Sequence, residues 1–167
     1  MEGLKKFFIK LDHAIEEFTK ISLVAMIIIV TLQVFSRKLL NYSFSWSMDV
    51  TMILLIWFSF LGIAIGFREG VHLAFHSLVA VFSPKWKRII DIMNGVLGII
   101  FGIFLIYYGT IMAINDLGQT VPSLSHLGIP MTIRSIIIPI SGIIIIVYSV
   151  LHLLGINTVR YKDMGGH

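Results

Sequence analysis

Residues 52–67 read MILLIWFSFLGIAIGF, and no side chain in this stretch carries a charge. With its flanks, the apolar segment extends from Trp46 to Phe67. An α-helix needs about 20 predominantly apolar residues to cross the hydrocarbon core of a bilayer. The segment therefore predicts a transmembrane helix over residues 46–67.

Three further apolar stretches have a comparable length, at residues 21–40, 89–114 and 131–154. The chain of 167 residues is 57% hydrophobic and only 13% charged, and its mean hydropathy is +0.93. A soluble domain with so few charges would expose a surface that aggregates. We therefore expect an all-α integral membrane protein, with four transmembrane helices in a single membrane domain. This composition excludes intrinsic disorder and nucleic-acid binding.

Two other segments have amphipathic patterns. In residues 4–18, apolar side chains recur at helical spacing opposite Lys, Asp, Glu and His side chains. Residues 71–82 carry a similar apolar stripe but are too short to cross a bilayer. Both predict helices that lie along the membrane surface, the second as an interfacial arm between spans two and three. Acidic residues interrupt the first segment, which argues against a cleavable signal sequence. Ser83 and Pro84 then predict a helix start that leads into the third span.

Lys and Arg side chains are distributed unevenly between the two sides of the predicted spans. If the N-terminus is cytoplasmic, three fall on the outer side, namely Arg37, Lys38 and Arg134. The other ten fall on the inner side: Lys5, Lys6, Lys10, Lys20, Arg68, Lys85, Lys87, Arg88, Arg160 and Lys162. Cytoplasmic loops of membrane proteins are enriched in Lys and Arg. We therefore expect both termini in the cytoplasm.

The six His residues raise the question of a metal or haem site. His72 and His76 are four positions apart, a spacing that metal ligands on a helix use. The same spacing fits two polar residues on the water-facing side of an interfacial helix. A haem-binding anchor would need axial His residues within the spans, whereas His152 is the only His in a span and lies near its end. The chain has no Cys. We expect no cofactor and no metal.

Asp49 is the most informative acidic residue, because it lies in the first turns of the second span. Arg37 closes the first span on the same side, and only a short link joins the two helices. Three interpretations remain open for Asp49: a structural ion pair with Arg37, a contact to a partner, or a coupling-ion site. Asp91 follows Arg88 by three positions, which suggests local pairing.

Small residues and one proline stand out inside the apolar stretches. Gly62 and Gly66, and likewise Gly98 and Gly102, share the four-residue spacing that permits close helix approach in lipid. Pro139 lies within the fourth span and predicts a kink there. No phosphate-binding loop, nucleophile elbow or carboxylate pair is visible, and we do not expect an enzyme.

Several short motifs follow one another along residues 34–142. Arg37 ends the first span, and Trp46-Ser47-Met48-Asp49 begins the second. Then come Leu61-Gly62, Arg68 followed four positions later by His72, and Leu127-Gly128-Ile129-Pro130. This series resembles the small membrane subunit, the DctQ-like Q subunit, of the tripartite ATP-independent periplasmic (TRAP) transporters. His76 departs from the family pattern, in which an acidic residue is frequent at this place.

The resemblance implies a four-span protein of the bacterial inner membrane with two protein partners. One is a large membrane subunit that moves substrate by a sodium-coupled elevator motion, and the other is a periplasmic solute-binding protein that delivers an organic acid. Membrane lipids are the remaining partner, and sialic acids and C4-dicarboxylates are typical family substrates. The small subunit would be a non-catalytic scaffold. The alternative is an independent, homodimeric four-helix transporter. The candidate structural or partner-contact residues are Arg37, Trp46, Asp49, Arg68 and His72.

Overall fold

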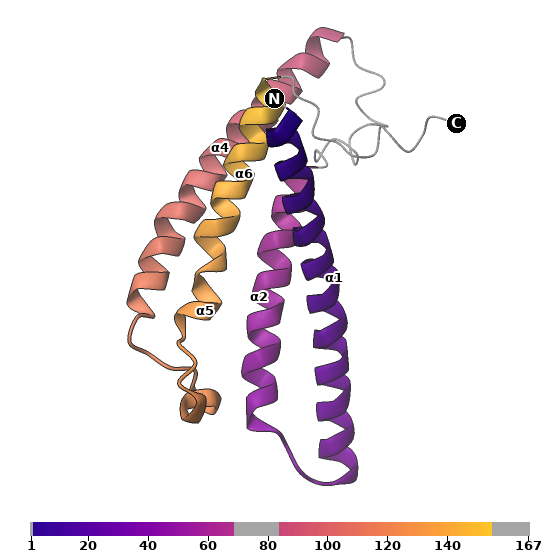
Figure 1. Cartoon of the computed structure of the whole chain (residues 1–167), viewed down its shortest axis with the longest axis vertical. Coiled ribbons are helices and arrows are strands. Elements are labelled where there is room, and N and C mark those ends of the chain that lie inside the picture. The colour runs from indigo at the N-terminus through magenta and orange to yellow at the C-terminus, as the bar shows by residue number, and fades with distance from the viewer. Residues whose placement is uncertain (1, 69–83, 155–167) are drawn as a thin grey trace, which may run out of the picture. The chain divides into compact units, whose positions relative to one another are not determined.

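The computed structural model describes residues 2–68 and 84–154, although not the side chains of residues 2–11, 84–87 and 126. The described chain is helical (Figure 1). Four of its helical segments are long and apolar enough to cross a membrane: Asp12–Leu39, Ser45–Arg68, Arg88–Asn115 and Thr132–Leu153. The expected all-α fold with four transmembrane helices is confirmed. Residues 71–82, including His72 and His76, lie outside the described residues, so the interfacial arm remains a prediction.

The first helix, α1, runs from Glu2 to Leu39 without interruption. From the sequence alone, an amphipathic helix is expected over residues 4–18 and a span over residues 21–40. Phe18-Thr19-Lys20-Ile21 contains no Gly or Pro, and helix propagation is cooperative, so nothing in this stretch ends the helix. At 1.5 Å per residue α1 is about 57 Å long, which exceeds a hydrocarbon core of about 30 Å. Part of α1 therefore lies outside the hydrocarbon, and a surface position for residues 4–18 remains a prediction.

The chain forms two compact units, which we describe separately. The first unit comprises Met1–Gly62 and Ala113–Ile137, and the second comprises Ile63–Met112 and Ile138–His167. In the first unit, α1 lies beside helix α2, which spans Ser45–Arg68 and enters the second unit at its end (Figure 1). The rings of Phe18 and Trp57 join the two helices, with centroids 5.4 Å apart.

The link between α1 and α2 turns within a few residues. Asn41 adopts a positive φ of 49°, a conformation that Asn tolerates better than most residues. The Ser36 hydroxyl donates a hydrogen bond to the Tyr42 carbonyl oxygen at 2.9 Å, which closes the turn. The Ser47 hydroxyl donates to the Phe44 carbonyl oxygen at 2.7 Å at the start of α2. Side-chain hydrogen bonds thus fix a connection that lacks regular structure.

In the second unit, helix α4 (Pro84–Asn115) lies beside helix α6 (Ile137–Leu153) (Figure 1). The contact depends on glycines of α4. A Cβ atom added to Gly98 would collide with the Ser149 hydroxyl, and one added to Gly102 would lie 2.8 Å from the Gly142 carbonyl oxygen. No described atom lies within 4 Å of a Cβ added at Gly62 or Gly66. The two glycine pairs therefore have different roles in this chain.

The fourth span is interrupted, but not at Pro139 itself. A short helix, α5, spans Thr132–Ser135, and α6 begins at Ile137; Ile136 between them keeps helical dihedral angles, so the interruption is local. Proline lacks the amide hydrogen that would bond to the carbonyl four residues earlier, and its ring crowds that carbonyl. For Pro139 that residue is Ser135, where α5 ends. The predicted irregularity is therefore present one turn before the proline.

Candidate partner-contact site

The segment between α4 and α5 is folded into a compact loop, residues 116–131, within the first unit. Thr120 and Pro130 form an isolated antiparallel bridge. The Met131 amide donates to the Gln119 carbonyl oxygen at 2.8 Å, and the Val121 amide donates to that of Ile129 at 3.0 Å. The 3-10 segment η1 (Pro122–Leu127) lies between these paired positions and has a kink at Leu124. The loop therefore has a defined backbone despite its Gly- and Pro-rich sequence.

Two glycines allow the loop to close. Gly118 has φ 79° and Gly128 has φ 63°, both in the left-handed region that favours glycine. Gly128 caps η1, and its amide donates to the Ser125 carbonyl oxygen. A side chain at either position would strain the backbone, because each lies outside the conformations that most residues adopt.

Asp49 fastens this loop to α2. The backbone amide of Ser123 donates to Asp49 Oδ2 at 3.2 Å, and the Ser123 hydroxyl donates to the same oxygen. Ser123 lies in the first turn of η1, where amide hydrogens have no carbonyl partner within the helix. The carboxylate of Asp49 therefore satisfies donors at the start of a helix that is 74 positions away in the sequence.

This contact differs from an ion pair with Arg37, which is one of the three interpretations of Asp49 that the sequence leaves open. Among the described residues, Asp49 accepts from Ser123 and makes no ion pair with Arg37. Arg37 lies in the last turn of α1 and is exposed. The short link between α1 and α2 made an Arg37–Asp49 contact plausible, but η1 offers both a backbone and a side-chain donor to the carboxylate.

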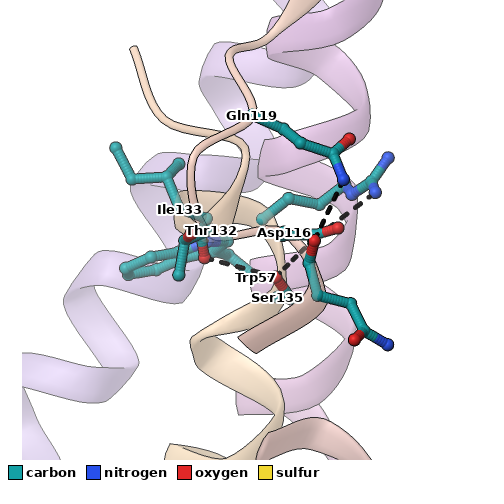
Figure 2. Close-up of polar contacts among 8 residues, drawn as sticks. Trp57, Asp116, Gln119, Thr132, Ile133 and Ser135 are labelled. Carbon is teal, nitrogen blue, oxygen red and sulfur yellow. Dashed lines mark hydrogen bonds and ion pairs between the residues drawn. The ribbon is translucent and has the colours of Figure 1, made fainter. Parts of the chain in front are cut away.

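Trp57 makes a second attachment between α2 and the segment that follows the loop. Its indole Nε1–H donates to the Ile133 carbonyl oxygen at 2.9 Å (Figure 2). In a continuous helix this carbonyl would accept from the amide of residue 137, but α5 ends at Ser135 and α6 begins only at Ile137. The Trp57 side chain therefore supplies a donor to a carbonyl at the interrupted part of the fourth span.

A buried acid joins the two ends of the loop (Figure 2). The Ser135 hydroxyl donates to Asp116 Oδ2 at 2.6 Å, and Arg134 Nη2 lies 3.6 Å from the same oxygen. The side chain of Asp116 is 11% exposed and that of Arg134 is 23% exposed. A charged group at this burial needs a partner, since an unpaired buried charge is costly. Asp116 and Arg134 therefore hold the end of α4 against α5.

Among the described residues, no contact with this cluster is seen for the candidates Trp46 and Arg68. Trp46 is 41% exposed at the start of α2, where its ring lies 5.8 Å from that of Phe44. Arg68 is the last residue of α2, belongs to the second unit and is only 3% exposed. His72 is not among the described residues. Asp49 is therefore the one predicted candidate that the described structure places in contact with the loop.

Four contact residues are not predicted from the sequence: Trp57, Asp116, Ser123 and Ser135. One usable signal was present, because Asp116 and Arg134 carry opposite charges at the two ends of a loop between apolar spans. Ser123 gave no comparable signal, since its backbone amide contributes as much as its side chain. The contacts of Asp49 with Ser123, and of Asp116 with Ser135 and Arg134, hold the loop in place, so the cluster has the chemistry of a structural support. Within residues 2–68 and 84–154, no group of three or more His, Cys, Asp or Glu side chains could hold a metal ion.

Comparison with known proteins gives one family match. The family model described as the DctQ component of tripartite ATP-independent periplasmic transporters matches residues 26–157. The match includes α2, α4, α6 and the loop of residues 116–131. None of the curated proteins searched matches the chain.

Proposed function

The chain belongs to the DctQ family of TRAP transporter components, and we propose that it is the scaffold subunit of a sodium-coupled importer of an organic acid. Membership of this family makes it a transporter component and not an enzyme. The observation that carries the proposal is the family match over residues 26–157, together with four helices able to cross a membrane.

The proposed partners are a large TRAP membrane subunit and a periplasmic solute-binding protein. DctQ components in general work with such partners. In our proposal the large subunit contains the moving substrate site, and the present chain enlarges the static frame around it. Much of the surface of α1 and α4 is apolar and exposed, which suits contact with lipid and with another membrane subunit.

The distribution of acidic residues supports a scaffold better than an ion-coupled transporter. Asp49 lies near the start of α2 and Asp91 near the start of α4, while Asp116 follows the end of α4. The long apolar stretches between these positions contain no Asp or Glu. Intramembrane carboxylates commonly mark ion and proton pathways. The sodium sites of the transporter would therefore belong to the large subunit, and so would the selectivity for sialic acids or C4-dicarboxylates.

The loop of residues 116–131 is the proposed docking surface for the binding protein. Asp49 fastens η1 to α2, and the Asp116–Ser135 hydrogen bond joins the end of α4 to α5. A surface that is already ordered loses less conformational entropy when a partner binds. The fixed loop would therefore favour binding of a partner that docks and leaves repeatedly.

We propose a location in the bacterial inner membrane with both termini in the cytoplasm. Support comes from the excess of Lys and Arg on one side of the four spans. The chain has no Cys, so single cysteines can be introduced for labelling from each side. His13→Cys and His72→Cys should react only from the cytoplasmic side, and Ser125→Cys only from the periplasmic side. The opposite pattern would overturn the orientation.

Transport measurements test the scaffold function directly. The purified chain, the large subunit and the binding protein are reconstituted into liposomes, each omitted in turn, and uptake of labelled sialic acid and C4-dicarboxylates is followed with and without a sodium gradient. We expect uptake only with all three proteins and the gradient. Uptake by the chain alone would instead support the independent homodimeric transporter. Equal uptake without the chain would contradict a scaffold role.

A further inference from the structure

Two cations at the end of α1 have no partner within the described chain. Arg37 and Lys38 occupy the last turn of α1, and both are exposed. Neither takes part in a hydrogen bond or an ion pair with any residue that the structure describes. Asp49, the acid closest in sequence on this side, is occupied by Ser123. The two positive charges are therefore available to a ligand outside the protein.

The surface around these cations is apolar on both sides along the chain. Phe35 precedes them and is 58% exposed, while Leu39 and Leu40 follow and are 75% and 72% exposed. Because exposed leucines follow the charges in sequence, we expect Arg37 and Lys38 to lie at the boundary of the apolar surface rather than fully in water. Long cationic side chains at such an edge bury their methylene groups and direct the charge toward the headgroup region.

The chain that follows is ordered and carries interfacial aromatic residues. The Leu40 amide donates to the Ser36 carbonyl oxygen at 2.9 Å, and the Ser36 hydroxyl holds the Tyr42 carbonyl. The rings of Tyr42, Phe44 and Trp46 form a series with centroid separations of 5.2 and 5.8 Å. Tyr and Trp are enriched at the level of lipid headgroups. This corner of the first unit therefore combines two free cations with aromatic side chains typical of the membrane interface.

We propose that Arg37 and Lys38 bind the phosphate of an anionic phospholipid in the leaflet at the C-terminal end of α1. Guanidinium groups match phosphate oxygens with paired hydrogen bonds, and ammonium groups add a compact charge. The negative end of the α1 dipole stabilises cations at this position. This interaction does not use their hydrogen-bond donors, which stay available to the phosphate. The ligand is a lipid rather than free phosphate because exposed leucines flank the cations, and acyl chains would cover them.

Quenching by spin-labelled lipids tests the proposal on the full chain in vesicles. A fluorophore is attached at position 40 through Leu40→Cys, and quenching is compared between phosphatidylglycerol and phosphatidylcholine that carry the same nitroxide on the acyl chain. The ratio of the two quenching constants measures local enrichment of the anionic lipid. Each cation near an anionic lipid surface changes the equilibrium constant for binding to that surface by about fivefold. We expect clear enrichment in the parent chain, with successive losses for Arg37→Gln and Arg37→Gln/Lys38→Gln.

Matched variants separate a specific site from general charge. Lys20→Gln/Arg88→Gln removes the same charge from other exposed positions and should leave the ratio at position 40 unchanged. Arg37→Lys should retain most of the enrichment. Circular dichroism identifies any variant that fails to fold. If Arg37→Gln fails to fold, the comparison of Arg37→Lys with the parent chain keeps the test valid. Excess inorganic phosphate should not reduce the ratio; a reduction would point to a free anion as the ligand and overturn the assignment. An equal ratio in the parent and in Arg37→Gln/Lys38→Gln would also overturn it.

These outcomes are independent of the transport function. A chain that fails the uptake measurement can still show lipid enrichment at position 40. If loss of Arg37 and Lys38 weakens binding of the solute-binding protein but leaves lipid enrichment unchanged, the cations contact a protein and the lipid assignment is wrong.

Discussion

The indole nitrogen of Trp57 donates a hydrogen bond to the carbonyl oxygen of Ile133 at 2.9 Å, across 76 positions of sequence. This contact joins the apolar middle of α2 to the short helix α5 in the first unit. It occurs where the fourth span is interrupted, so a donor from one helix compensates for irregular backbone in another. Ile133 lies two positions before Ser135, whose carbonyl lacks an amide donor from Pro139, so Trp57 supports the same irregular stretch from a neighbouring helix.

Replacing Trp57 by Phe should lower the stability of the first unit. The Phe ring can keep the contact with Phe18, whose centroid lies 5.4 Å from that of Trp57, but it cannot donate to Ile133. We expect a loss of about 1 kcal/mol, as for other single hydrogen bonds in proteins and membranes. The measurement is unfolding of the purified chain in detergent. Trp46→Phe is the matched control, because its indole donates no hydrogen bond to a described residue. Equal effects of the two changes would contradict a role for the indole N–H.

Removing the Asp49 carboxylate should loosen the loop of residues 116–131. In Asp49→Ala both Ser123 donors lose their acceptor, whereas Asp49→Asn retains an amide oxygen for one of them. Hydrogen bonds to charged groups contribute about 1.5–3 kcal/mol. Amide hydrogen exchange in η1 should therefore be fastest in Asp49→Ala and intermediate in Asp49→Asn. Arg37→Gln, which removes a charge without a described contact, should leave exchange in η1 unchanged.

A charge exchange distinguishes this contact from the pairing expected from sequence. The double variant Arg37→Asp/Asp49→Arg would preserve an ion pair if the two residues faced each other. Since Ser123 donates to Asp49, an arginine at position 49 would face two donors instead of an acceptor. We therefore expect exchange in η1 to be as fast as in Asp49→Ala. Recovery of slow exchange in the double variant would show that Arg37 and Asp49 do interact.

The main features of the fold could be predicted because one physical constraint dominates them. A bilayer requires long apolar helices, and residues 46–67 and their counterparts satisfy that requirement from composition alone. The continuity of α1 was less predictable, because amphipathic and fully apolar patterns meet at Phe18–Ile21 without any residue that ends a helix. Sequence shows which environment each part prefers, whereas the backbone hydrogen bonds decide whether the two parts join.

The candidate site was predictable only in part, because its contacts connect residues that are distant in sequence. The sequence indicates that the Asp49 carboxylate needs a partner, and the short link between α1 and α2 makes Arg37 a candidate. The actual partner depends on where loop folding places Ser123. The glycine pairs show the same limit: Gly98 and Gly102 meet neighbouring atoms, whereas Gly62 and Gly66 do not, although the spacing is identical. Spacing defines a face of a helix but not what lies against it.

Loss of Asp116 should destabilise the chain more than loss of Ser135. Asp116→Ala leaves the guanidinium of Arg134 partly buried without its acid, while Ser135→Ala removes one hydrogen bond of 2.6 Å. Breaking a deeply buried ion pair costs about 3–5 kcal/mol, and the 23% exposure of Arg134 places this pair toward the lower end. Unfolding in detergent gives both values. Asp116→Ala/Arg134→Ala should recover part of the loss, because the unpaired charge is gone; no recovery would mean that Arg134 is solvated without Asp116.

Adding a methyl group at Gly102 should disrupt the contact between α4 and α6. The new Cβ of Gly102→Ala would lie 2.8 Å from the Gly142 carbonyl oxygen and 2.5 Å from Cγ1 of Ile146. Ile146 can change its rotamer, but Gly142 contributes backbone, so the helices must separate. Overpacking of this kind costs about 1–3 kcal/mol.

The matched change is Gly62→Ala, which adds the same methyl group where no described atom lies within 4 Å. Alanine is also the better helix former by about 1 kcal/mol in water. Thermal unfolding of the purified chain should therefore show a lower midpoint for Gly102→Ala and an unchanged or higher midpoint for Gly62→Ala. Similar midpoints for the two variants would mean that close approach of α4 and α6 contributes little to stability. A loss for Gly62→Ala that appears only after assembly with the large subunit would place a partner helix against that face of α2.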